Sequence, residues 1–336
     1  MTIKDLANKT GYAVATVSRV LNNHPNVSEK ARAVIMEAVE ESGFQLNANA
    51  KQLKQQHATS ILVLVKGTAN ELFSEQVETI RNYVSGTKYP IVVDYLDENA
   101  NEVRRALRLC REKKPLGILF LGGDACNFRT DFEKIDVPCV VVANDMSRVD
   151  VPNLSSVSID DHEACRCAVD FLISRGHRRI AVIGGEREIS DTGRSRYEGC
   201  LESLRSHGIA FDEERDYQRG RFSCQGGYRA AEALMEQGRS FTALFAMADV
   251  MAIGAIRALH DKGLRVPEDV SVMGFDGLAL TSYLVPRLST VAQPAKQMAQ
   301  RGVELLISRI EGESQAVHET VPFELLERES VQSLKP

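Results

Sequence analysis

The sequence lacks the segments that would carry a chain into or across a membrane. It has no run of about 18 apolar residues that could span a bilayer, and its longest apolar stretches, such as residues 61–65 and 138–143, have the length of strands. The N-terminus is polar and begins a helical pattern at once, so we expect no secretory signal peptide. These absences predict a cytoplasmic protein.

Paired cysteines and common catalytic motifs are absent as well. The seven cysteines are odd in number, scattered and without a C-x-x-C pair, so we expect reduced thiols and no metal site. No G-x-G-x-x-G, G-x-x-x-x-G-K-S/T or H-E-x-x-H motif is present. The polar cluster at residues 160–163 lies where a helix should begin and is interpreted as its cap. We therefore predict no enzyme, no cofactor and no metal, with an α/β enzyme as the alternative.

The first 57 residues do carry a pattern, that of a helix-turn-helix. A small residue in a first helix, a turn glycine and an apolar residue in a second helix occur at the required spacing as Ala7, Gly11 and Val17. Gly11 can take the left-handed backbone of a sharp turn, and Thr2 and Ser28 stand at expected helix N-caps. The second helix then exposes a small, polar face that suits a major groove. The alternative is a three-helix bundle without a DNA partner.

The charge distribution supports a DNA-binding head. Residues 1–57 carry seven Lys or Arg against five Asp or Glu, whereas the rest of the chain carries 34 against 41, and the net charge is −5. A mildly positive head on an acidic body approaches DNA head-first. The following segment, residues 47–56, is either a linker or a helix too short to be stable alone.

From Ile61 onward, apolar runs of strand length alternate with amphipathic helical stretches. Strands are predicted near residues 61–65, 90–94, 117–121, 138–142, 179–183, 216–220, 242–246 and 270–274. Helices are predicted near residues 74–85, 99–112, 161–175, 193–207, 225–237, 249–262 and 294–311. Such alternation indicates parallel sheets covered on both faces. Because the pattern restarts after about residue 160, we predict two similar α/β lobes.

Several motifs occur in order along the chain: TIKDLA, TVSRVLN, NANAKQL, VPEDVSVMGFD and PRLSTVAQP. Together they resemble the LacI/GalR family of bacterial repressors, above all its galactose-repressor branch. The resemblance implies a helix-turn-helix domain at residues 1–45, a hinge helix or linker at 46–58, and an effector-binding and dimerisation body at 59–336 that is built like a periplasmic sugar-binding protein. Crossings near residues 160–162, 290–293 and 320–323 would give a first lobe of about 59–161 and 290–323, and a second of about 162–289 and 324–336.

The resemblance also implies how the head meets DNA. Val14 and Ala15 contact base edges, Arg19 contacts a base or a phosphate, and the polar residues of the same face contact phosphates. Leu53 enters the minor groove as an apolar wedge; the alternative is that it packs on the body. The predicted DNA contacts are Thr2, Val14, Ala15, Thr16, Ser18, Arg19, Asn22, Lys51 and Leu53. Lys51 and Leu46 depart from the Arg and Pro that are usual in the family, which predicts a less rigid hinge.

An effector is expected between the lobes. The residues implied by the resemblance are Phe73, Asp145, Thr192, Arg196, Phe222, Asp249 and Asp276. An arginine can fork onto hydroxyls or a carboxylate, aspartates accept from hydroxyls, and an aromatic ring stacks on a sugar face. The alternatives are that Asp276 caps a turn and that Arg196 pairs with a carboxylate of its own lobe.

This predicted site departs from the usual sugar-binding pattern. Ala248 and Gly277 replace an Asn and an Asp, and residues 70–73 read NELF instead of NPFF. Ser190 stands where purine-binding relatives carry Arg, so we expect a carbohydrate rather than a purine, with an atypical or phosphorylated sugar left open.

The predicted function is that of a transcriptional repressor controlled by a small molecule. Two heads would bind the half-sites of a pseudo-palindromic operator as a homodimer. The chain ends without leucine heptads, which favours a dimer over a tetramer. The alternative functions are a sugar-binding module and an α/β enzyme, both without a DNA partner.

Overall fold

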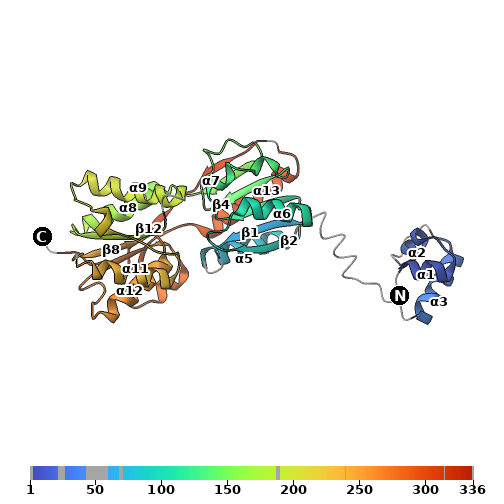
Figure 1. Cartoon of the computed structure of the whole chain (residues 1–336), viewed down its shortest axis with the longest axis horizontal. Coiled ribbons are helices and arrows are strands. Elements are labelled where there is room, and N and C mark those ends of the chain that lie inside the picture. The colour runs from blue at the N-terminus through green and yellow to red at the C-terminus, as the bar shows by residue number, and fades with distance from the viewer. Residues whose placement is uncertain are drawn as a thin grey trace. The chain divides into compact units, whose positions relative to one another are not determined.

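The computed structural model describes residues 3–21, 27–42, 60–67, 71–186, 190–238, 240–313 and 315–334. The chain divides into two compact units, a head of residues Met1–Gln56 and a body of residues His57–Pro336 (Figure 1). No helix in these ranges is long and apolar enough to cross a membrane.

The head contains the helices α1 (Ile3–Thr10), α2 (Val14–Leu21) and α3 (Glu29–Ser42). Gly11 has a φ of +70° and its N–H donates to the Ala7 carbonyl at 3.0 Å, so it closes the turn before α2 as predicted. Ser28 caps α3, because its Oγ accepts from the N–H of Ala31 at 3.3 Å. The core of the head joins all three helices and consists of Leu6, Ala7, Val17, Val20, Ile35 and Ala38.

The first lobe of the body is a six-stranded parallel sheet in the order β11-β5-β4-β3-β1-β2. Its strands are β1 (Ile61–Lys66), β2 (Ile91–Leu96), β3 (Gly117–Leu121), β4 (Cys139–Val142), β5 (Leu154–Ser158) and β11 (His318–Thr320). One face packs on α5 (Glu71–Val84) and α13 (Ala295–Ile310), and the other on α6 (Glu102–Lys113) and α7 (Ala125–Phe128). A short 3-10 helix, η1 (Phe132–Lys134), follows α7.

The second lobe is also six-stranded, in the order β12-β10-β9-β8-β6-β7. Its strands are β6 (Ile180–Gly184), β7 (Tyr217–Arg219), β8 (Ala243–Ala246), β9 (Ser271–Asp276), β10 (Ser289–Ala292) and β12 (Glu324–Leu326), of which β12 runs antiparallel to β10. Its helices are α8 (Asp161–Ser174), α9 (Asp191–Ser206), α10 (Glu213–Asp216), α11 (Cys224–Glu236), α12 (Asp249–Asp261) and η2 (Ala279–Tyr283).

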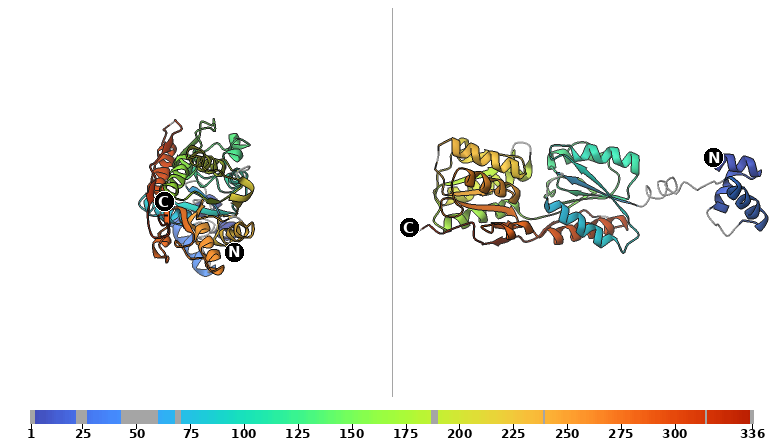
Figure 2. Two further views of the ribbon diagram at one scale, coloured as in Figure 1. Left: turned by 90° about the vertical axis from the view of Figure 1, so that its left-hand side faces the viewer. Right: turned by 90° about the horizontal axis from the view of Figure 1, so that it is seen from below.

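Helices of the second lobe pack in pairs on its two faces. α8 contacts α9 on one face, and α11 contacts α12 on the other. The second pair approaches closely at Gly254, where an added Cβ would lie 1.9 Å from the Cys224 carbonyl oxygen. Figure 2 shows the two lobes lying side by side in the view from below. The prediction of two α/β lobes built on parallel sheets is confirmed.

The chain passes between the two sheets three times: between β5 and α8, between β10 and α13, and between β11 and β12. One boundary differs from the sequence-based expectation, which assigned residues 290–292 to the first lobe. These residues belong to β10, which pairs with β9 and β12 of the second sheet. The lobe therefore changes after Ala292, at the start of α13.

Candidate operator surface and effector site

The exposed face of α2 carries the residues predicted to meet DNA. Val14 is 42% exposed, Ala15 and Arg19 are exposed, and Thr16 and Ser18 are half-buried. The opposite face holds Val17 and Val20, which the core of the head buries. A small polar surface with one long cation is thus presented by a helix that its partners hold in place. Thr2, Asn22, Lys51 and Leu53 lie outside the described residues.

In the second lobe, Arg196 of α9 is only 7% exposed and is held on three sides. Its Nε donates to Asp161 Oδ1 at 2.7 Å, and its Nη1 donates to the Met247 carbonyl at 2.8 Å. The guanidinium lies over the ring of Phe275, 4.0 Å from its centroid. Arg196 therefore pairs with a carboxylate of its own lobe, which is the alternative that the sequence left open.

Asp161 is also a member of this site, although the sequence analysis interpreted it as part of a helix cap. The cap of α8 is its neighbour Asp160, whose Oδ1 accepts from the N–H of Glu163 at 2.9 Å. Burial raises the pKa of the Asp161 carboxyl, Arg196 opposes that shift, and the nearby carboxylates of Asp160 and Asp145 add to it.

Asp276 ends β9 and is 6% exposed. Its φ of +121° is uncommon for a residue with a side chain, and strained backbone of this kind gathers at ligand sites. Its Oδ1 accepts from Gln293 Nε2 at 2.9 Å. Burial raises the pKa of Asp276 to about 6, and the charge of Arg196 opposes the increase.

Asp249, at the start of α12, is fully buried, and both of its oxygens are occupied. Oδ1 accepts from Thr290 Oγ1 and Oδ2 accepts from the N–H of Leu278, each at 2.7 Å. Burial, followed by the charge of Asp276, raises its pKa to about 8. In this structure the Asp249 carboxyl is buried and holds the turn after β9, and its predicted contact with an effector stays a prediction.

The two predicted aromatic residues each pack on a glycine that follows a strand. A Cβ added at Gly122, after β3, would lie 2.8 Å from Phe73 Cζ, and one added at Gly185, after β6, would lie 2.7 Å from Phe222 Cε2. Phe73 is buried and Phe222 is half-buried. These two glycines therefore leave room for a ring at the carboxyl ends of strands, where open α/β sheets bind ligands.

Several side chains bridge the lobes. Asn144, after β4, accepts from the N–H of Gly123 at 2.8 Å and donates to Thr192 Oγ1 at 2.6 Å. Arg221 of the second lobe pairs with Glu98 and with Asp97, the latter at 3.5 Å. Thr192 is thus engaged across the interface of the lobes, and Asn144 is a bridging residue that sequence reasoning missed.

Asp145 is exposed, and its two oxygens accept from the N–H and hydroxyl of Ser147 at 2.9 and 2.8 Å. Within the described ranges, no hydrogen bond or ion pair joins Asp145, Phe73 or Phe222 to Arg196 or Asp276. The structure brings together three residues at strand ends of the second sheet, Asp161 at the start of α8, and Arg196 of α9. We call this group the strand-end cluster: Asp161, Arg196, Asp249, Asp276 and Gln293.

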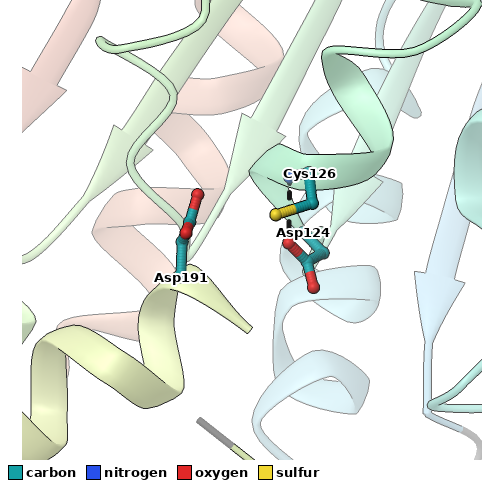
Figure 3. Close-up of side chains that lie close together, drawn as sticks. All are labelled: Asp124, Cys126 and Asp191. Atoms are coloured by element: carbon teal, nitrogen blue, oxygen red, sulfur yellow. Dashed lines mark hydrogen bonds between the residues drawn. The ribbon is translucent and has the colours of Figure 1, made fainter. Parts of the chain in front are cut away.

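A second polar group lies where the lobes meet (Figure 3). Ligand atoms of Asp124, Cys126 and Asp191 lie within 4.8 Å of one another, and the Cys126 N–H donates to Asp124 Oδ1 at 3.0 Å. Asp191 pairs with Arg129 at 3.2 Å and with Arg194 at 3.4 Å. Desolvation, and then the charge of Asp124, raises the pKa of the Cys126 thiol, so it stays protonated. Arginine charge already balances this group, which we interpret as a contact between the lobes.

The residues that sequence reasoning missed share one signal. Asn144 and Gln293 each come shortly after a strand, and Lys66 ends β1, where its Nζ lies 2.8 Å from Glu102 Oε2. A polar residue directly after an apolar strand is a candidate for a site at the carboxyl edge of the sheet. This signal could have found Lys66 and Asn144, whereas Gln293 follows a strand that the sequence did not predict, and the partners of all three residues depend on the fold.

Comparison with known proteins identifies both units. Residues 2–47 match the family described as bacterial regulatory proteins, lacI family, and residues 169–331 match the periplasmic binding protein-like domain. The transcriptional regulator MalR of Clostridium butyricum is 36% identical over 335 residues, which cover 98% of this chain and 99% of that protein.

Solved structures agree with this result. The lac repressor dimer bound to operator and an anti-inducer has a TM-score of 0.73 and 26% identity, and the match covers 99% of both chains. The complex of the transcriptional regulator CelR with cellobiose has a TM-score of 0.72 and 27% identity, and covers 98% of this chain and 99% of that one. These relatives are regulators and not enzymes. The chain therefore belongs to the LacI family of bacterial regulatory proteins, as its sequence motifs predicted, and is a DNA-binding transcriptional regulator.

Proposed function

We propose that the protein represses transcription from a pseudo-palindromic operator as a homodimer and that a saccharide bound at the strand-end cluster controls this binding. The observation that carries the proposal is the placement of Arg196 and Asp276 together at the carboxyl edge of the second sheet. The cellobiose complex of CelR and the operator complex of the lac repressor dimer support a saccharide and a dimer. Binding to chromosomal DNA would place the protein in the cytoplasm.

Each residue of the site would make the contact with the ligand that its chemistry allows. Arg196 donates to hydroxyls of the ligand, Asp276 accepts from them, and Phe73 and Phe222 provide apolar walls. Thr192 and Asp145 contact the ligand where the lobes meet, and Asp249 positions the turn that carries Asp276.

The head would read DNA through α2. Val14 and Ala15 contact thymine methyl groups, and Arg19 contacts a base or a phosphate. The remaining predicted contacts, which position the head and the hinge, are Thr2, Thr16, Ser18, Asn22, Lys51 and Leu53. Residues 1–45 would form the DNA-binding domain, and residues 46–58 would form the hinge.

The effector would control operator binding through the contacts between the two lobes. A ligand that touches both lobes changes the balance between arrangements with and without bonds such as Asn144–Thr192 and Arg129–Asp191. It can do so only through different affinities for the two states, and a hundredfold difference corresponds to about 2.7 kcal/mol of coupling.

Fluorescence anisotropy on operator DNA, selected from a random pool, tests the proposal. Sugars are added to the full-length protein and to Arg196→Lys, which keeps the charge but loses the planar fork. We expect one sugar to change operator affinity for the wild type, and Arg196→Lys to need at least tenfold more of it while binding operator normally in its absence. An unchanged sugar response in Arg196→Lys would contradict the assigned site.

A second variant tests the DNA face. Arg19→Ala removes the one long cation of the exposed α2 face and should weaken operator binding by at least tenfold without altering thermal unfolding of the body. Lys30→Ala is the matched control, since it removes a cation from the exposed start of α3. Equal losses in the two variants would indicate a general charge effect and not recognition by α2.

A further inference from the structure

The strand-end cluster holds three carboxyl groups and one cation. The carboxyl groups of Asp161 and Asp276 act on the single guanidinium of Arg196, and Asp249 places a third carboxyl group close to Asp276; each of the four residues is at least nine-tenths buried. Arg196 is committed to Asp161 at 2.7 Å, to the Met247 carbonyl and to the face of Phe275. Its positive charge is therefore already used within the protein and is poorly placed to attract an anion.

The same cluster has a surplus of hydrogen-bond acceptors. Gln293 is 6% exposed and its Nε2 donates to Asp276 Oδ1 at 2.9 Å. Its Oε1 is buried and accepts no hydrogen bond from the part of the chain that the structure describes. A buried amide oxygen without a donor is costly, typically by about 1–3 kcal/mol. This oxygen, which adjoins Asp276, is therefore a position for a donor on a ligand.

The facing edge of the first lobe does not offset the negative charge. Lys66 pairs with Glu102 at 2.8 Å, and that buried carboxylate also accepts from the N–H of Asp124 at 2.6 Å. Arg129 pairs with Asp191, while Asp145 adds a further carboxylate close enough to raise the pKa of Asp161. The cations Lys66 and Arg129 are thus neutralised in place, as Arg196 is.

We infer that the effector is a saccharide without acid groups, neutral or bearing an amine, and that the site rejects sugar phosphates and uronates. Hydroxyl and ammonium groups supply the donors that Gln293 Oε1 and Asp276 accept. A phosphate or carboxylate would add negative charge to a buried acidic cluster, where repulsion is screened less than in water. This inference rests on the proposed function and narrows it, since it removes the phosphorylated sugar that the sequence left open.

Isothermal titration calorimetry on the full-length protein tests it with matched ligands. Glucose, galactose, mannose, maltose and cellobiose are each compared with a 6-phosphate form, and the three hexoses also with their 2-amino and uronate forms. We expect at least one neutral or amino sugar to bind and its acid form to bind at least tenfold more weakly. An acid form that binds as tightly as its neutral parent would overturn the inference and leave the proposed function standing. Failure of every compound to bind would count against both.

A variant tests whether the strand-end cluster causes the preference for saccharides without acid groups. Asp276→Asn keeps the shape of the side chain and removes one charge, so the affinity ratio of neutral to acid form should fall at least threefold, even if both affinities decline. Asp269→Asn is the control, because it removes an exposed carboxylate that pairs with Arg265; its ratio should match that of the wild type. An unchanged ratio in Asp276→Asn, with unfolding temperatures that show both variants are folded, would overturn the inference.

Discussion

Replacing Arg196 with methionine should strongly destabilise the second lobe. The substitution leaves the Asp161 carboxylate buried, since the two side chains of the pair are only 9% and 7% exposed, and it also removes the guanidinium that lies over Phe275. Removing one partner of a buried ion pair costs about 3–5 kcal/mol. In a body of this size, about 2 °C of Tm is lost per kcal/mol, so the Tm should fall by about 6–10 °C.

The assay is thermal unfolding followed by circular dichroism. It includes the variants Arg196→Met, Asp161→Asn and their combination. Because the residues are in contact, the double variant should be more stable than the sum of the two losses by about 1–3 kcal/mol. Arg265→Met is the control: that arginine pairs with Asp269 but its side chain is 70% exposed, and exposed pairs contribute about 0–1 kcal/mol. The reasoning fails if Arg196→Met costs no more than Arg265→Met, or if the two losses simply add.

Three further predictions concern other parts of the chain. Gly11→Val should weaken operator binding by anisotropy, because the left-handed backbone there costs a side chain about 1–2 kcal/mol although no atom lies within 4 Å of the added Cβ; equal affinity of Gly11→Val and wild type would contradict this. Gly185→Ala should lower sugar affinity in calorimetry, because its Cβ would lie 2.7 Å from the ring of Phe222; normal affinity would mean that the ring has no role. Burial holds the pKa of Asp249 at about 8 against an ordinary 3.8, so the folded protein binds this proton more tightly and loses stability as pH rises from about 4 to 8. Tm measured from pH 5 to 8 should therefore decline less steeply in Asp249→Asn, and parallel curves would show that this carboxyl does not titrate there.

Much of the fold could be predicted because its strands are unbroken apolar runs. The strands predicted near residues 61–65 and 117–121 are β1 and β3, both fully covered on their two faces apart from Lys66 at the end of β1. β5 and β10 were missed as strands because serines and a threonine interrupt the apolar pattern. Those hydroxyls are nonetheless buried, since distant segments satisfy them: Ser156 Oγ lies 2.8 Å from His318 Nδ1, and Ser289 Oγ accepts from the N–H of Arg328 at 2.9 Å.

The sequence by itself determined the architecture and the family. Local patterns sufficed for this: periodic apolar runs, a glycine at the turn of the head, and motifs in a specific order. It also indicated Arg196 and Asp276 as site residues, because each stands in a motif.

Only the tertiary structure decided what these side chains do. Arg196 pairs with Asp161, which lies 35 residues away in the sequence. The two carboxyl oxygens of Asp249 accept hydrogen bonds from Leu278 and Thr290, which lie 29 and 41 residues away. A hydrogen bond depends on distance and direction between atoms, which spacing along a chain does not specify once the chain has crossed between sheets. The charge balance of the strand-end cluster therefore arises from the fold and not from any single motif.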